Sequence, residues 1–192
     1  MSKTLGLIII SPFADWEAAT LAAMAREWFG VNIVWIAQTS HVTSMGGLTV
    51  ERDRDTGLGV NKDLDAIAII GSASWEKGQD QDVVTLVTAV HQRGGVVAAI
   101  CGGVIPLAHS GLLSNVAHTS NDAAWLSGQA PNYQGLDKHI ESSAAVVDGR
   151  IITASALAPV TFAQNVLSAL LPEQAAEITA AAASFASEHA PR

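Results

Sequence analysis

The chain has 192 residues, which is enough for one domain with a sizeable core and short for two. Apolar residues make up 49% of the chain and charged residues 15%, a balance that excludes an intrinsically disordered polymer. The formal net charge is −8 and no cluster of Lys and Arg occurs, which argues against nucleic acid or an anionic membrane as a partner.

The first half of the chain alternates short apolar runs with stretches of helical periodicity. The apolar runs over residues 5–10, 31–37 and 64–70 are predicted to be strands buried on both faces, as in parallel sheets. The first run is too short to span a membrane, and no signal-peptide cleavage site follows it. A helix is predicted over residues 15–29, and a hairpin or bend over residues 43–51.

The second half of the chain continues this alternation. A helix over residues 82–93 and a buried strand over 96–100 precede a helix over 104–109. The other predicted elements are a short strand at 117–119, a helix at 122–126, a hairpin of 144–147 with 151–154, and helices at 159–170 and 172–189. The alternation predicts an α/β fold, with a doubly wound, mostly parallel sheet and helices on both faces.

Three loops follow predicted strands at the edge where such folds place their sites. Sites in doubly wound sheets lie at the carboxyl ends of the strands. Residues 11–15, 71–78 and 100–103 occupy these positions. We therefore expect the three loops to meet around one site.

The most specific motif surrounds the single cysteine, Cys101, in the sequence VVAAICGGVIPLAHSG. Its Ala-x-Cys-x-Gly pattern is similar to the Gly-x-Ser-x-Gly nucleophile elbow, in which a strand turns sharply into a helix. At the start of a helix the macrodipole is expected to lower the pKa of the thiol, and the N–H of Gly102 is placed to stabilise an oxyanion. The alternative is a small buried hydrophobic residue, which free cysteines often are.

The stretch AAICGGVIPLAHSGLL resembles the nucleophile-elbow segment of the ThiJ/PfpI superfamily, which has a class I glutamine amidotransferase-like, flavodoxin-type fold. Four further stretches resemble the family in the same order, and they are SPFADWEAATL, IIGSASWEKG, HTSND and IITASALAPVTFA. The resemblance extends from Leu5 to about Leu171 and implies one domain over residues 1–192. It also implies a homodimer, the usual state of the family.

The resemblance implies that Cys101 is a nucleophile or a redox thiol and that Glu17 is the buried acid beside it. A protonated Glu17 would donate a hydrogen bond to the thiolate, and burial near a second anion would keep its carboxyl neutral. The alternative for Glu17 is a solvated acid in the first helical turn. Asp15 is the second candidate for the partner of the cysteine, although it is better explained as the helix N-cap.

The loop at Gly71 and Ser72 is implied to face the elbow. Family members often carry two glycines there, with N–H groups directed at the reacting oxygen. Ser72 replaces the second glycine and still offers its N–H to an oxyanion. Trp75 and Trp125 are candidates for lining the pocket, whereas the other tryptophans are expected in the core.

Histidine is where the chain departs from the family pattern. Members called intracellular proteases have a histidine directly after the cysteine, and here Gly102 takes that place. His118 is the remaining candidate for a base near Cys101, with a structural or pocket-lining role as the equal alternative. No metal-binding spacing or phosphate-binding loop occurs, so neither a metal nor a cofactor is expected.

Three functions are compatible with these residues. The first is a cysteine-dependent hydrolase or lyase acting on small substrates, with the amidase, peptidase, glyoxalase or deglycase chemistry that the resemblance implies. The second is a non-enzymatic redox sensor or stress-response protein that uses oxidation of Cys101. The third is a glutaminase-like subunit, which the lack of a His-x-Glu near the C-terminal end makes the weakest. A lone thiol fits a reducing cytoplasm.

Overall fold

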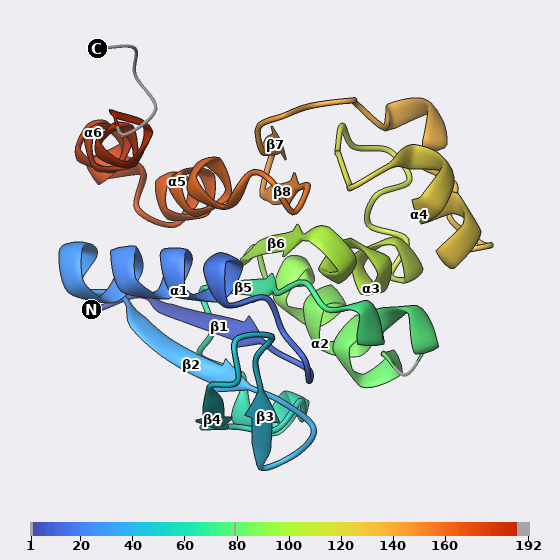
Figure 1. Cartoon of the computed structure of the whole chain (residues 1–192), viewed down its shortest axis with the longest axis horizontal. Helices are drawn as coiled ribbons and strands as arrows, with labels where there is room; N and C mark the ends of the chain where they lie inside the picture. Colours follow the sequence, from blue (N-terminus) through green and yellow to red (C-terminus); the bar gives the residue numbers. More distant parts are fainter. Residues whose placement is uncertain (1, 79, 188–192) are drawn as a thin grey trace.

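A six-stranded sheet forms the centre of the computed structural model, which describes residues 2–78 and 80–187 (Figure 1). The spatial order of the strands is β2-β1-β5-β6-β8-β7. Their bounds are Thr4–Ile8 for β1, Asn32–Ile36 for β2, Ala66–Ile69 for β5, Val96–Ile100 for β6, Val146–Asp148 for β7 and Ile151–Ala154 for β8. All neighbouring pairs are parallel except β7 with β8.

Helices cover both faces of the sheet, as Figure 1 shows. Helices α1, α5 and α6 pack on one face, and α2 and α3 pack on the other, with α4 beside α3. Their bounds are Asp15–Ala23 for α1, Gln81–Gln92 for α2, Val104–His109 for α3, Ala123–Gln129 for α4, Pro159–Leu170 for α5 and Ala175–Ala186 for α6. The predicted doubly wound, mostly parallel architecture is confirmed.

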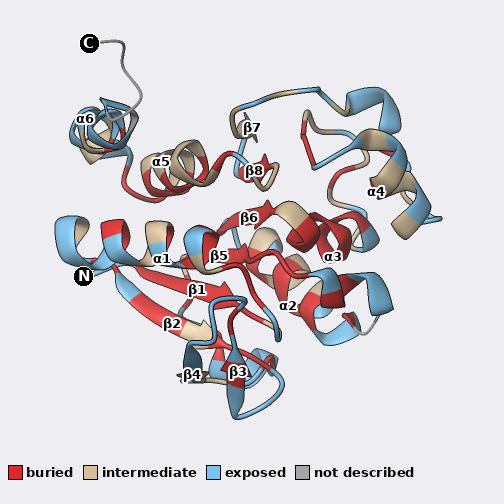
Figure 2. Cartoon of the chain, in the orientation of Figure 1, coloured by how far each residue is buried: buried red, intermediate tan, exposed pale blue. Residues whose placement is uncertain are grey.

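The central strands are buried on both sides because successive residues face opposite cores. In β6, Val96, Ala98 and Ile100 pack with α1 and α5, whereas Val97 and Ala99 pack with α2 and α3. Figure 2 shows the strands β1, β5, β6 and β8 as almost continuously buried, with exposed residues on the outer sides of the helices. This two-sided burial explains why these strands read as unbroken apolar runs.

Both predicted hairpins are present. Strands β3 (His41–Thr43) and β4 (Thr49–Glu51) pair antiparallel around residues 44–48, and β7 pairs with β8. The predicted strand at residues 117–119 is wrong, because His118 makes only an isolated bridge to His139. The last helix begins at Ala175 after a 3-10 turn, and its predicted end at residues 188–189 lies outside the described residues.

The predicted N-cap role of Asp15 is wrong. Ala14 is the N-cap of α1, and Asp15 is the first residue within the helix. The Asp15 carboxylate accepts hydrogen bonds from the Ser44 hydroxyl and, at 2.7 Å, from the Gly46 N–H. The side chain therefore ties the β3–β4 hairpin to α1, and the hydrogen bond from Ser44 lowers the pKa of Asp15.

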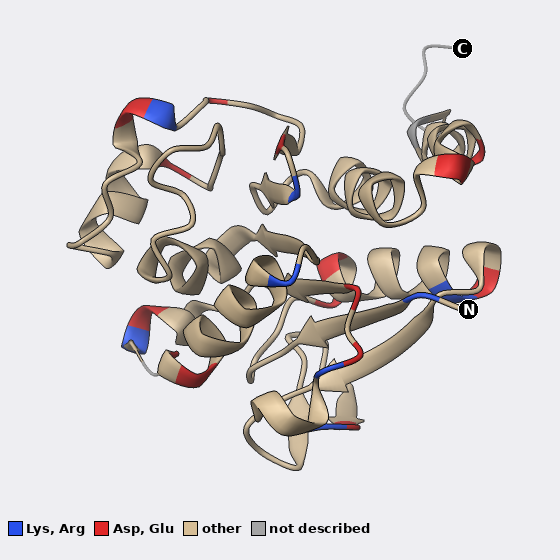
Figure 3. Cartoon of the chain, turned by 180° about the vertical axis from the view of Figure 1, so that it is seen from behind, with Lys and Arg blue, Asp and Glu red and all other residues tan. Residues whose placement is uncertain are grey.

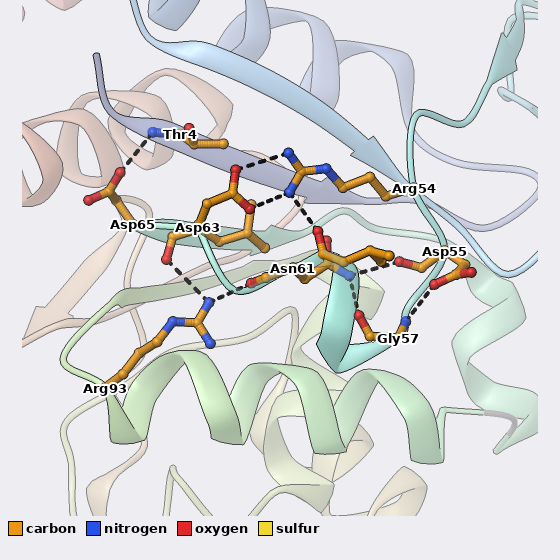
Figure 4. Close-up of polar contacts among 10 residues, drawn as sticks. Thr4, Arg54, Asp55, Gly57, Asn61, Asp63, Asp65 and Arg93 are labelled. Carbon is orange, nitrogen blue, oxygen red and sulfur yellow. Dashed lines mark hydrogen bonds and ion pairs between the residues drawn. The ribbon is translucent and has the colours of Figure 1, made fainter. Parts of the chain in front are cut away.

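A polar network joins the loop before β5 to the neighbouring elements, as Figure 4 shows. Arg54 makes a two-pronged ion pair with Asp63 at 2.5 and 3.0 Å, and Arg93 donates to the Asn61 carbonyl at 2.9 Å. Asp65 accepts from the Thr4 N–H at 2.9 Å, at the amino ends of β1 and β5. The network runs from the amino ends of β1 and β5 to the segment beside the end of β2, so it supports the scaffold.

The charged residues do not gather on one element. Figure 3 shows Lys and Arg on separate segments, several of them beside an acidic residue. Within residues 2–78 and 80–187, no helix has both the length and the apolar composition that crossing a membrane requires.

Candidate active site

The three predicted loops meet at the carboxyl ends of β1, β5 and β6. The Ala14 N–H donates to the Gly71 carbonyl at 3.0 Å, and the Ser74 hydroxyl donates to the Ser11 carbonyl at 2.7 Å. A Cβ added to Gly102 would lie 2.4 Å from the Ser72 carbonyl oxygen, so these two segments are in direct contact. This convergence confirms the expectation that the loops form one site.

Cys101 sits on the sharp turn between β6 and α3. Its φ of 56° places it in the left-handed region, which a residue with a Cβ adopts only at a cost in free energy. Gly102 and Gly103 follow without side chains because the Ser72 and Ile69 carbonyl oxygens would each lie 2.4 Å from an added Cβ. The turn leaves Cys101 partly exposed, unlike the fully buried cysteine of the alternative interpretation.

Glu17 projects from α1 to the sulfur and is fully buried. Its Oε2 accepts a hydrogen bond from the Gly71 N–H at 2.8 Å, and its carboxyl also interacts with the Cys101 thiol. A Cβ on Gly71 would lie 2.5 Å from Glu17 Oε2 and 2.7 Å from Cys101 Cβ. Gly71 therefore lets the two side chains approach each other and holds the carboxyl in place.

The N–H of Gly71 does not face a reacting oxygen, because Glu17 already occupies it. That part of the prediction is wrong. The Ser72 hydroxyl accepts from the Ser74 N–H at 3.1 Å, and Ser72 is buried. Of the predicted oxyanion donors, the N–H groups of Ser72 and Gly102 remain.

The pKa values of the pair rise together. Burial raises the pKa of Glu17 to about 7. Burial of the sulfur is the largest cause that raises the pKa of the Cys101 thiol, and the negative charge of Glu17 raises it further. The hydrogen bonds from Asn121 and Gly102 lower this pKa but offset the rise only in part. The prediction that the helix start lowers the thiol pKa is therefore wrong for the unliganded site, because burial and Glu17 outweigh the donors.

The two acidic groups titrate as a pair. Two adjacent negative charges in a buried site repel each other, so the thiolate forms readily only when Glu17 is neutral. One proton can then pass between sulfur and carboxyl without leaving the site. The arrangement provides a thiol with its own proton acceptor.

Asn121 is the contact of Cys101 that the sequence analysis did not identify. Its Nδ2 donates to Cys101 Sγ at 3.4 Å, and its Oδ1 accepts from the Ala156 N–H at 2.9 Å, which orients the amide. Asn121 also lines an open cavity of about 660 Å³, together with Ser120, Glu141, Ser142, Ser143, Ser155, Ala156 and Leu157. The cavity therefore opens next to the residue that contacts the sulfur, and serine hydroxyls and one carboxylate are among the groups that line it.

His118 is not positioned to act as the base for Cys101. Its Nδ1 lies 2.8 Å from the Val116 carbonyl, and its Nε2 is hydrogen-bonded to the Tyr133 hydroxyl. Both ring nitrogens are thus occupied away from the sulfur, and burial lowers the pKa of His118. The structural role, which was the alternative interpretation, fits this geometry.

Trp75 does not line the cavity beside Cys101. Its indole N–H donates to the Ile70 carbonyl at 2.8 Å, and the ring lines a separate cavity of about 150 Å³ with residues such as Ile8 and Val83. The prediction is wrong because the 3-10 turn at residues 73–77 directs this side chain into the core. Trp125 is also outside the cavity lining, with its indole nitrogen 3.4 Å from Glu76 Oε1.

The comparisons with known proteins identify the family of the chain. The sequence model of the DJ-1/PfpI family matches residues 3–169. The chain belongs to the DJ-1/PfpI family. The match contains all the residues that surround the sulfur.

Known members of the DJ-1/PfpI family match most of the chain. The "Uncharacterized protease YoaZ" of Bacillus subtilis is 30% identical over 177 residues, which cover 88% of this chain and 84% of that protein. The DJ-1 superfamily protein Atu0886 of Agrobacterium tumefaciens is 39% identical, with a TM-score of 0.87 and coverage of 98% and 100%. A thiJ/pfpI family protein of Bacillus anthracis is 26% identical, with a TM-score of 0.78 and coverage of 88% and 84%.

In this DJ-1/PfpI chain the groups around the sulfur come from α1, from the loops after β5, β6 and β8, and from the segment before α4. Among the residues that the structure describes, no group of three His, Cys, Asp or Glu side chains is arranged to hold a metal ion. The chemistry available at the site is that of a thiol, a carboxyl, an amide and backbone N–H donors.

Proposed function

We propose that the chain is a cysteine-dependent hydrolase or lyase that acts on small carbonyl or amide substrates through Cys101. The observation that carries the proposal is the buried Glu17 carboxyl against a partly exposed thiol on a strained turn. Strained backbone and raised carboxyl pKa values are typical of catalytic sites. The name of the Bacillus subtilis relative, an uncharacterized protease, is consistent with a hydrolase.

The first step is addition of sulfur to the substrate. The thiol proton passes to the Glu17 carboxylate, Sγ bonds to the carbonyl carbon, and the π electrons of the carbonyl move to its oxygen. The N–H groups of Gly102 and Ser72 are the candidate donors for this oxyanion. With a 2-oxoaldehyde the product is a hemithioacetal.

An amide substrate continues to a thioester. The C–N bond breaks, and the nitrogen takes the proton from Glu17 as it leaves. Water then hydrolyses the thioester and restores the thiol. Serine hydroxyls and the Asn121 amide in the wall of the cavity can donate hydrogen bonds to polar groups of a small substrate.

The test measures turnover of methylglyoxal and of small amides by the parent, Cys101→Ser and Glu17→Gln. Turnover should vanish in Cys101→Ser and fall strongly in Glu17→Gln. Glu27→Gln is the matched control, because Glu27 is an exposed acid of the same helical segment. Turnover that survives in Cys101→Ser would exclude Cys101 as the nucleophile.

Oxidation of the sulfur is the second candidate function. Asn121 Nδ2 and the Gly102 N–H already donate to Sγ, and the same donors would bind the oxygens of a sulfinate. Peroxide titration followed by intact mass separates the two functions. Stepwise oxygen addition at Cys101 with no Cys101-dependent turnover would favour the redox function.

The homodimer and the cytoplasmic location stay predictions. Exposed apolar side chains lie near the mouth of the site, with Leu157 90% exposed and Trp16 48% exposed. The indole of Trp16 contacts the Ala156 carbonyl at 3.3 Å, so this surface is continuous with the cavity. Light scattering measures the molar mass of the purified protein in solution. If this surface joins two copies, the parent should have the mass of a dimer and Leu157→Asp the mass of a monomer.

A further inference from the structure

A second polar cluster lies in the wall of the cavity beside Cys101. The Ser120 hydroxyl is 2.9 Å from His139 Nε2, and His139 Nδ1 is 3.7 Å from Glu141 Oε1. Ser120 and Glu141 line the same cavity as Asn121, the residue that contacts the sulfur. The cluster therefore shares the cavity wall with the residue that contacts the sulfur.

The His139 ring is held inside the protein and not in solvent. Its side chain is only 3% exposed, and the His118 ring packs edge-on against it with centroids 5.6 Å apart. The Ile140 N–H donates to the His118 carbonyl at 2.7 Å, which fixes the backbone next to His139. The Ser120 hydroxyl therefore contacts both this ring and the cavity.

Glu17 is a buried acid, so a second proton acceptor in the cavity wall would assist the hydrolysis step. Glu17 is fully buried, and its Oε2 accepts a hydrogen bond from the Gly71 N–H. Hydrolysis of a thioester requires a base that can reach a water molecule in the cavity. Ser120 lines that cavity, and Glu17 does not.

We propose that Ser120 and His139 form the proton relay that activates water for hydrolysis of the Cys101 thioester, an inference that rests on the proposed function. Water attacks the carbonyl carbon and gives its proton to Ser120 Oγ, while the Ser120 hydroxyl proton passes to His139 Nε2. The new C–O bond forms, the C–S bond breaks, and its electron pair returns to sulfur. His139 then returns the proton through Ser120 and the cavity to the sulfur.

The Ser120 hydroxyl has two acceptors available to it. The Asp122 carbonyl lies at 3.0 Å and His139 Nε2 at 2.9 Å, so rotation of the hydroxyl switches the relay on. Proton transfer from Ser120 to His139 requires an unprotonated Nε2. The neutral His139 ring must therefore carry its proton on Nδ1, which is directed at Glu141. The other titratable groups around this ring are His118 and, beyond it, Tyr133 and Asp137.

The experiment uses p-nitrophenyl acetate as the probe. Release of p-nitrophenolate reports acetylation of Cys101, and intact mass then follows the loss of the acetyl group. In Ser120→Ala and His139→Gln the acetyl adduct should still form with a single burst of p-nitrophenolate, and loss of the acetyl group should slow by about 100-fold or more.

Matched variants make the result specific. Ser120→Thr restores a hydroxyl and should recover most of the rate, and His41→Gln removes an exposed histidine on β3 as a control. If no acetyl adduct forms on the parent, the proposed function and the relay both fail. If the adduct forms and is lost equally fast in Ser120→Ala and the parent, the relay alone is overturned.

Discussion

Asn121 donates a hydrogen bond to the sulfur of Cys101 over 3.4 Å, and its other amide atom is tied to the Ala156 N–H. The side chain thereby links the loop after β8 to the nucleophile. It also lines the cavity next to the sulfur contact. One amide therefore contacts both the sulfur and the cavity in which the proposed function places its substrate.

Replacing Asn121 by Ala should raise the pKa of the Cys101 thiol, because a hydrogen bond to the sulfur is lost. The rate of alkylation by iodoacetamide at pH 7 should fall by about 3- to 10-fold, which corresponds to one modest hydrogen bond. Cys101 is the single cysteine, so intact mass reports this residue alone. Asn132→Ala in the turn after α4 is the control, and an unchanged rate in Asn121→Ala would contradict the contact.

Glu17→Gln should change the pH dependence of Cys101 alkylation. In the parent, Glu17 ionises at about pH 7 next to the thiol and contributes an inflection there. The glutamine cannot ionise, so the profile should reduce to a single thiol ionisation. That ionisation should fall at a lower pH than beside a carboxylate, because the negative charge has gone. A profile identical to that of the parent would show that the two groups are not coupled.

The raised pKa of Glu17 also makes a prediction about stability. The folded carboxyl binds its proton more tightly than the unfolded one, with a pKa of about 7 against 4.5. Stabilisation is therefore fully present below pH 4.5 and is lost as the pH rises to about 7, with an upper bound of about 3 kcal/mol. Urea denaturation across this range should show a shallower pH dependence in Glu17→Gln than in the Glu27→Gln control.

Gly71→Ala should disrupt the site without removing any functional group. The added methyl would meet Glu17 Oε2 at 2.5 Å and Cys101 Cβ at 2.7 Å, so the pair must separate. We expect a loss of roughly 1–3 kcal/mol in the free energy of unfolding, together with a lower Glu17 pKa as water enters. Gly59→Ala is the control because nothing lies within 4 Å of its added Cβ. Equal stability of the two variants would contradict the packing at Gly71.

Much of the fold follows from local patterns in the sequence. The apolar runs become β1, β2, β5 and β6 because each is buried on both faces, and the Asp148-Gly149 turn produces the β7–β8 hairpin. The elbow at Cys101 was also predictable, since the two glycines after it have no room for side chains. These features depend on neighbouring residues in the chain.

The features that were not predictable depend on tertiary distances. Asn121 reaches the sulfur only because Ala156, 35 residues further on, holds its amide. Whether the thiol pKa shifts up or down depends on how deeply the sulfur is buried and on how close Glu17 lies to it. A sequence pattern specifies neither. The sequence pattern made His118 a candidate base for Cys101, but its ring nitrogens are hydrogen-bonded to the Val116 carbonyl and the Tyr133 hydroxyl. These contacts depend on the tertiary fold.

The left-handed backbone at Cys101 gives this residue a conformational cost. A glycine there would relax the turn by roughly 1–2 kcal/mol, the penalty of this conformation for a residue with a Cβ. If the proposed function holds, the reactive sulfur and this cost reside in the same residue. A more robust fold could then be obtained at this position only by giving up the proposed nucleophile.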